Sequence, residues 1–176
     1  DSGYAGCASY KDYEDLLARD DIDAVSIVTP DHWHVMPAVA AAKAGKDIFL
    51  QKPLALTISE GRILSDTVHA TNRVFQCGSQ QRSDKMFRHV CELVLNGRIG
   101  ELQRIEVGFS PDETCGMPPD MPVPKNLDYD KWLGQAPVKP YTETRVHPQK
   151  GYDRPGWLRI RDYGHGMITG WGAHHI

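Results

Sequence analysis

The stretch that decides the fold is DAVSIVTPDHWHVMPAVAAAKAGKDIFLQKPL, residues 23–54. It opens with a short apolar run at 24–28, which ends at a Thr-Pro pair, and closes with a second run at 46–50, which ends at Gln-Lys-Pro. The alanine-rich segment between the runs stops at Gly45, a residue type that commonly follows the last turn of a helix. Two short apolar runs on either side of a helix predict parallel strands joined by a right-handed crossover.

The alternation continues on both sides of this stretch. Apolar spacing predicts a helix at 10–19, and the run RVFQCG at 73–78 predicts a third strand. Between the second and third strands, Thr57 and Glu60 have the spacing of a capping box at the start of a helix. We therefore expect a doubly wound α/β sheet, in which the polar loops after the strands meet at one edge and bind a ligand.

The composition favours a globular protein with a small-molecule ligand. The chain has 176 residues, 40% hydrophobic and 24% charged, with a formal net charge of −3 and no block of like charge. This balance argues against nucleic-acid or membrane-surface partners, and no apolar run approaches the roughly 18 residues of a membrane span. The four cysteines contain no CxxC pair, so we expect neither a zinc ribbon nor a disulfide framework.

The period of the pattern changes in the second half of the chain. Apolar and polar residues alternate at 101–109, which predicts a strand with one buried face and the opening of a second, antiparallel-type domain. Prolines crowd the segment 110–156, where we expect an irregular path over the surface. The segment 164–176 has the pattern of a helix start.

Five motifs occur along the chain: DAVSIVTPDHWH at 23–34, AAKAGKDIFLQKPLALTISEGRIL at 41–64, NGRIG at 96–100, LDYDKWLGQAPVKPY at 127–141 and DYGHGMITGWGAHHI at 162–176. In this order they resemble the middle of a Gfo/Idh/MocA-family oxidoreductase. The resemblance implies a Rossmann domain that holds NAD or NADP, followed by an α/β domain with an open, mostly antiparallel sheet. It further implies hydride transfer to or from a sugar or related polyol between the two domains.

On this basis residues 1–97 are expected to be a partial Rossmann domain and residues 98–176 the start of the C-terminal domain. The chain has no strand-GxGxxG-helix unit to cradle a pyrophosphate, and it starts with Asp1. We therefore expect a piece of a longer protein, homo-oligomeric as a whole, that binds dinucleotide poorly by itself. The cellular location stays open between the cytoplasm and the periplasm.

Lys52 is the predicted catalytic and substrate-binding residue. The resemblance places it where the family has a Glu-Lys-Pro triplet beside the nicotinamide, so Gln51 and Pro53 are implied cofactor contacts. An ammonium can donate a hydrogen bond to the substrate oxygen that gains charge. Gln51 replaces the glutamate of the family and supplies no negative charge beside Lys52.

His174 is the second predicted catalytic and substrate-binding residue. Family members commonly have Asp-x-x-x-His on this helix, with both side chains on one face. His174 matches the histidine, but Gly170 stands where the aspartate would be. We expect His174 to act as the acid or base, and packing or capping is the equal alternative.

Further contacts come from the other loops at the sheet edge. The resemblance assigns Thr29, Pro30 and His34 to the cofactor. Gln80 is a candidate cofactor contact and Arg82 a candidate substrate contact, with a solvated loop as the equal alternative. Trp132 is expected to pack between the domains, and the polyol pocket has further candidates among which the sequence does not choose: Arg145, His147, Arg154 and Arg159.

A metal site is the alternative interpretation of two histidines. His32 and His34 form an HxH pair, and a zinc ion would need a third ligand from His165, His174 or His175. The spacing is nonspecific and the pair precedes a helix. We therefore predict no metal, with His32 and His34 capped or exposed.

Two other functions remain in view. Some relatives of the family cleave glycosidic bonds by transient oxidation with NAD, and the motifs are compatible with that outcome. A non-catalytic module that retains the fold is the second, because both Gln51 and Gly170 depart from the catalytic pattern.

Overall fold

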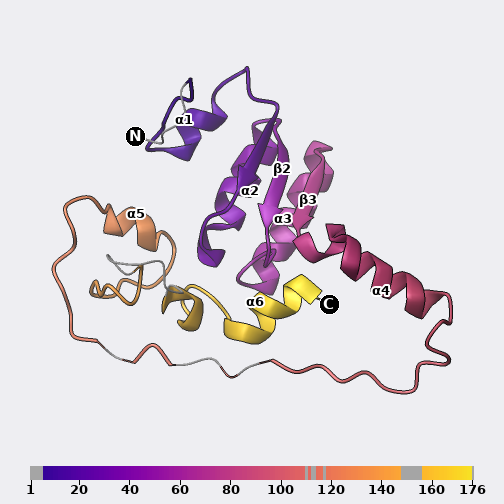
Figure 1. Ribbon diagram of the computed structural model, residues 1–176. Coiled ribbons are helices and arrows are strands. Elements are labelled where there is room, and N and C mark those ends of the chain that lie inside the picture. The colour runs from indigo at the N-terminus through magenta and orange to yellow at the C-terminus, as the bar shows by residue number, and fades with distance from the viewer. Residues whose placement is uncertain (1–5, 110, 112–113, 117, 148–155, 176) are drawn as a thin grey trace.

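The computed structural model describes residues 6–109, 111, 114–116, 118–147 and 156–175. Three strands, β1 (Ala24–Ile27), β2 (Asp47–Gln51) and β3 (Phe75–Gly78), form one parallel sheet in the order β1-β2-β3 (Figure 1). Each strand begins and ends within two residues of its predicted position. The parallel Rossmann-type sheet is confirmed, and so is the expectation that the loops after the strands share one edge.

One face of the sheet carries the main apolar core. Helices α2 (Val35–Lys43) and α3 (Ile58–Thr71) pack against each other on this face. Along β2, Ile48 and Leu50 are buried, whereas Phe49 between them points to the other face and is 43% exposed. Burial of each such aliphatic side chain stabilises the fold by roughly 1.5–3 kcal/mol. The other buried members of this cluster are Leu17 of α1 (Tyr13–Leu17), Ile27, Val35, Ala38, Ala41, Ala42 and Leu64.

The predicted capping box starts α3. The Thr57 hydroxyl accepts from the Glu60 backbone N–H at 3.2 Å, and the Glu60 carboxylate accepts from the Thr57 N–H at 2.9 Å. These two bonds satisfy donors that the first turn of a helix leaves unpaired. They also fix the far end of the loop that follows β2.

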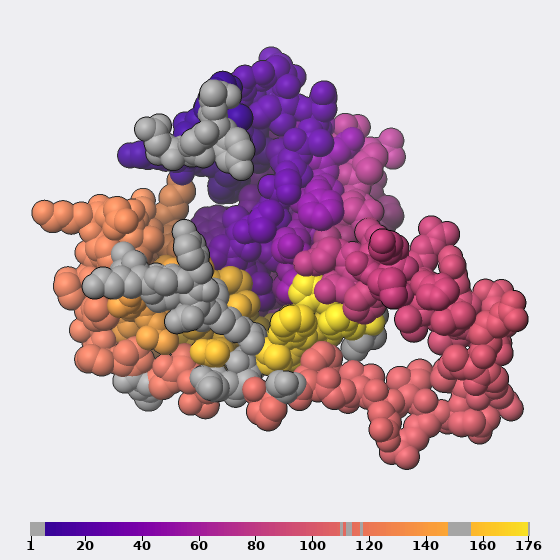
Figure 2. Space-filling model, in the orientation of Figure 1, coloured from indigo at the N-terminus to yellow at the C-terminus, as the bar shows by residue number. Residues whose placement is uncertain are grey.

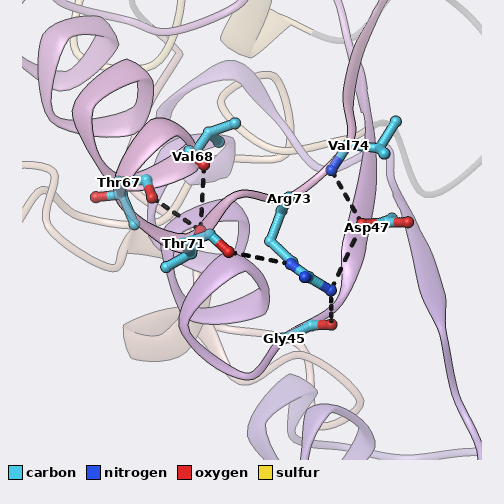
Figure 3. A network of polar contacts seen from close by, with 7 residues as sticks. All are labelled: Gly45, Asp47, Thr67, Val68, Thr71, Arg73 and Val74. Atoms are coloured by element: carbon cyan, nitrogen blue, oxygen red, sulfur yellow. Dashed lines mark hydrogen bonds and ion pairs between the residues drawn. The ribbon is translucent and has the colours of Figure 1, made fainter.

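The amino ends of the strands are joined through Arg73 (Figure 3). Its guanidinium donates to the carbonyls of Gly45 at 2.9 Å and Thr71 at 3.2 Å, and lies 3.9 Å from the Asp47 carboxylate. Asp47 in turn accepts from the Val74 backbone N–H at 3.0 Å. The end of α3, the end of α2 and the start of β2 are therefore held together by one side chain.

The predicted strand at 101–109 is wrong. After α4 (Lys85–Leu95), the described part of this segment has no regular structure and stands away from the compact part of the molecule (Figure 2). Two of its alternating apolar residues stay in solvent, with Ile105 72% and Val107 64% exposed. Alternation predicts which side chains a strand would bury, but a strand forms only where a partner pairs with its backbone. No described residue pairs with this segment.

The second half of the chain forms a separate apolar cluster. The helical elements of this half are α5 (Tyr129–Leu133), the 3₁₀ turn η3 (Gly156–Arg159) and α6 (Gly166–His175), and the cluster involves α5 and η3 but no residue of α6. The described residues contain one sheet, and it is parallel, so the open antiparallel sheet is not confirmed. Arg154, a polyol candidate, lies outside the described residues. The buried side chains of this second cluster are Tyr129, Leu133, Tyr141, Val146 and Tyr163.

Among the described residues, no helix has both the length and the apolar character needed to cross a membrane. The four cysteines, Cys7, Cys77, Cys91 and Cys115, are free thiols. This agrees with their irregular spacing in the sequence.

Candidate active site

Helix α6 lies across the ends of β2 and β3 (Figure 1). Three side chains from those strand ends and α6 make the connection. The Lys52 ammonium donates to the Gly170 carbonyl at 3.1 Å, and the Ser79 hydroxyl donates to the Ala173 carbonyl at 2.9 Å. The His174 ring is 2.8 Å from the side-chain oxygen of Gln81. A helix from the second half of the chain therefore closes over the polar edge of the sheet.

Lys52 is half-buried at the centre of this edge, directly after β2. Its backbone N–H donates to the side-chain oxygen of Gln51 at 2.8 Å, so the amide of Gln51 turns back onto the chain. The charge of Lys52 acts on three titratable groups around it, Asp31, His34 and His174.

His174 has the geometry of a neutral base. Burial lowers the pKa of His174 below its usual range, and the charges of Lys52 and His175 lower it further. Because the oxygen of Gln81 can only accept, Nδ1 of His174 carries the proton, and Nε2 of the neutral ring holds a lone pair. The sequence named Gln80 and Arg82 in this loop and passed over Gln81, the residue that contacts His174.

His34 links two loops from inside the protein. Its Nδ1 lies 2.6 Å from the Pro53 carbonyl and its Nε2 lies 2.9 Å from the Thr29 carbonyl. Burial lowers the pKa of His34, which favours a neutral ring that donates to one of the two oxygens. The ring is 1% exposed, so its atoms face protein and the side chain positions the loops after β1 and β2.

His32 points elsewhere. Its Nε2 lies 2.9 Å from the Trp132 carbonyl, and the ring packs against the rings of Trp132 and Tyr163 at 5.2 and 5.0 Å between centroids. The Trp33 indole N–H donates to the same carbonyl at 2.9 Å. Trp132 therefore packs between the two halves of the chain, as predicted. His32 and His34 are buried and hydrogen-bonded to backbone carbonyls in different places, which fits the capped alternative and not the exposed one. No group of three ligands among the described residues gathers around a metal position.

Thr29 and Pro30 line an open cavity of about 620 Å³. The Thr29 hydroxyl donates to the Trp33 carbonyl at 3.0 Å, which shapes the turn η1 (Asp31–Trp33). Pockets of this size, with aromatic and polar lining, commonly bind small molecules. The remaining lining residues include Tyr10, Asp12, Tyr13, Lys131 and Trp132.

Gln80 and Arg82 lie on the turn η2 (Gln80–Ser83) after β3, and both are exposed. Arg82 lines a cavity of about 310 Å³ together with Gln81, His174 and His175. The structure thus places Arg82 beside the predicted acid–base residue, while Gln80 faces solvent.

Asp31 is a buried acid at this edge that the sequence analysis missed. It is 6% exposed, and burial raises the pKa of its carboxyl to about 6, although electrostatic interactions with Lys52 and His165 oppose the rise. The available signal was its place in the loop after a parallel strand, where ligand-binding residues gather.

Comparisons with known proteins decide the family. Residues 3–79 match the family model described as "Oxidoreductase family, NAD-binding Rossmann fold", and residues 113–176 match "Oxidoreductase family, C-terminal alpha/beta domain". The chain belongs to the Gfo/Idh/MocA oxidoreductase family. The resemblance carried by the five motifs is confirmed, and with it NAD or NADP as the class of cofactor.

Individual relatives are similar over about half of the chain. An uncharacterized oxidoreductase of Rhizobium meliloti, ORF334, is 37% identical over 102 residues, which are 58% of this chain and 30% of the relative. A glycosyl hydrolase family 109 protein of Shewanella sp. (strain W3-18-1) is 36% identical over 97 residues, which are 55% of this chain and 21% of the relative. The solved structure of myo-inositol 2-dehydrogenase from Lactobacillus plantarum matches 52% of this chain and 27% of its own, with 33% identity and a TM-score of 0.50. The chain thus spans less than a third of these relatives.

Two departures of this Gfo/Idh/MocA chain have a structural counterpart. The amide of Gln51 is bonded to the backbone of Lys52 and brings no charge. Gly170 offers Lys52 its backbone carbonyl in place of a carboxylate. The family commonly has an aspartate at the position of Gly170. In this chain another carboxylate, Asp31 in the loop after β1, interacts electrostatically with Lys52.

Proposed function

We propose that the protein is an NAD(P)-dependent oxidoreductase that transfers a hydride between the nicotinamide and a hydroxyl-bearing carbon of a sugar or polyol. The observation that carries this proposal is the meeting of Lys52 with α6, 3.1 Å from the Gly170 carbonyl and within electrostatic reach of His174. These residues are far apart in sequence and converge on the edge of the sheet where parallel α/β folds bind ligands.

The residues present fit a dinucleotide at this edge. Thr29 and Pro30 line a cavity of about 620 Å³, large enough for part of such a cofactor. We assign cofactor contact to these two residues, to Gln51 and Pro53 at the end of β2, and to Gln80 beyond β3. When bound, the nicotinamide supplies the acceptor or donor of the hydride.

Lys52 and His174 act on the substrate oxygen. In the direction of oxidation, Nε2 of neutral His174 accepts the hydroxyl proton while the Lys52 ammonium donates a hydrogen bond to the same oxygen. Arg82, beside His174, contacts the remaining hydroxyl groups. A polyol or sugar substrate is supported by the relation to an inositol dehydrogenase.

The first test is isothermal titration of NAD and NADP into this chain and into a form extended upstream. We expect the extended form to bind and the 176-residue chain to bind weakly, because the sequence lacks a GxGxxG unit. A form extended upstream that binds neither dinucleotide would overturn the proposal and favour a non-catalytic module.

A second candidate function is NAD-dependent hydrolysis of a glycoside. It is favoured by the 36% identity to a glycosyl hydrolase family 109 protein. The two functions differ in net redox, so an aryl glycoside assayed with and without NAD separates them. Release of the aryl group that needs NAD but leaves no NADH would support hydrolysis, whereas NADH that accumulates with an inositol substrate would support the dehydrogenase.

A further inference from the structure

Asp31 occupies an unusual place for a carboxylate. Among the described residues it is the one buried acid, at 6% exposed. Its neighbour Pro30 lines the cavity assigned to the cofactor, whereas Asp31 lines a different cavity of about 400 Å³. The same cavity is lined by Pro53, which is next to Lys52, and by Thr169, which is next to Gly170, so Asp31 faces both sides of the Lys52–Gly170 contact. The turn η1 therefore separates two cavities, and the carboxylate is on the side of α6.

The surroundings of this carboxylate come from three elements. Its Oδ2 lies 3.4 Å from the position that a Cβ on Gly164 would take, so the acid abuts the loop that leads into α6. Lys52 after β2 and His165 before α6 are the positive or titratable groups that act on it, and His34 follows on its own loop. His165 is held in place by a 2.6 Å contact from Nε2 to the Leu56 carbonyl.

We propose that Asp31 is the carboxylate of the Lys52–His174 site, supplied from the loop after β1 in place of the acid that Gly170 lacks on α6. This inference rests on the proposed function and deepens it. Asp31 is a positioning residue: it balances the charge of Lys52 and keeps the ammonium directed toward the substrate oxygen. It does not itself touch the substrate.

The energetics agree with such a role. Burying a carboxylate is costly unless nearby charges or hydrogen bonds compensate it. An ionised Asp31 at neutral pH therefore lowers the stability of the fold relative to a neutral residue at this position. Its electrostatic interaction with Lys52 explains why a carboxylate is present there. The charge balance also predicts a pH effect, since Asp31 takes up a proton as the pH falls through about 6 and Lys52 then loses its counter-charge.

The test compares Asp31→Asn with the parent in the full-length protein. We expect kcat to fall about tenfold with KM nearly unchanged, a smaller loss than the roughly 10²–10⁴-fold for an acid–base group itself. The acid limb of the pH profile has two ionisations in the parent, from Asp31 and His174, and one in Asp31→Asn. Asp66→Asn, an exposed acid on α3, is the matched control and keeps the parent profile.

A rescue variant separates electrostatics from structure. A Cβ at Gly170 would meet nothing within 4 Å, so Gly170→Asp has room to place a carboxylate on α6 near Lys52. In the double variant Asp31→Asn with Gly170→Asp, we expect at least half of the lost kcat, on a logarithmic scale, to return. NAD binding measured by titration shows that each variant is folded.

Each result of these measurements either supports or overturns the proposed role of Asp31. A lost ionisation together with rescue supports the proposal. An unchanged pH profile in Asp31→Asn, or a loss of kcat that Gly170→Asp does not restore, overturns it and leaves Asp31 a structural residue. Failure of the proposed function is distinguished by Lys52→Ala, because full turnover in that variant would remove the catalytic site that Asp31 is said to support.

Discussion

Arg73 lies at the amino end of the parallel sheet and Lys52 at the carboxyl end, and these two cations have different surroundings. At the amino end, Arg73 donates to two backbone carbonyls and lies beside Asp47, and both side chains are partly exposed to solvent. At the carboxyl end, Lys52 has one backbone carbonyl from α6 and a buried carboxylate, Asp31, within electrostatic reach. The contacts of Arg73 at the amino end stabilise the fold, whereas the buried charge of Asp31 at the carboxyl end lowers its stability.

Lys52→Ala should give the largest effect and separate the two ends most sharply. We expect turnover in the full-length protein to fall by about 10²–10⁴, because the substrate oxygen loses its hydrogen-bond donor. Steady-state kinetics with an inositol substrate and NAD measure it. Lys43→Ala, at an exposed position in the last turn of α2, is the control and should keep full activity. Equal activity of both variants would contradict the assignment.

Asp31→Asn should make the protein more stable while making it less active. The folded-state pKa of about 6 exceeds the ordinary 3.8, so the folded state binds more protons between these pH values and its stability falls as pH rises through them. Above pH 6 the penalty is at most about 3 kcal/mol, and the neutral amide removes it. Urea unfolding at pH 8 and pH 4 should show a stabilised variant at pH 8 and parent-like stability at pH 4. A variant no more stable than the parent at pH 8 would show that the buried charge carries no such cost.

Arg73→Ala should have the smallest effect of the three variants, and it should lower stability without changing turnover. Loss of its two carbonyl contacts should lower the free energy of unfolding by about 1–2 kcal/mol, with kcat unchanged. Arg62→Ala, at an exposed ion pair on α3, is the matched control and should cost less than about 0.5 kcal/mol. Denaturant unfolding and turnover measured on the same samples test this. A fall in kcat with Arg73→Ala would mean that the two ends of the sheet are coupled.

The elements with local signals were predictable from the sequence. Strand β2 and helix α3 follow from side-chain periodicity and from Thr57 and Glu60, whose capping contacts lie within three residues of each other. The segment 101–109 has equally clear alternation but no partner among the described residues, and periodicity carries no information about pairing. This is why the same kind of pattern succeeded in one half of the chain and failed in the other.

The site was predictable only in part. Lys52 and His174 were named as candidates through the family motifs, and the structure brings their elements together. Asp31 was missed because its meaning depends on Lys52 and His165, which reach it only through the fold. Gln81 was passed over for its neighbours because the orientation of side chains on a short 3₁₀ turn is set by what packs against it, here α6.

The contacts of His34 have a mechanical consequence. The ring spans the carbonyl of Thr29, which lines the proposed cofactor cavity, and the carbonyl of Pro53, which follows Lys52 directly. A rigid, buried ring transmits displacement between the two points that it joins. A displacement of the Thr29 carbonyl would therefore also reach Pro53, the residue next to Lys52, so the loops after β1 and β2 are coupled through the inside of the protein.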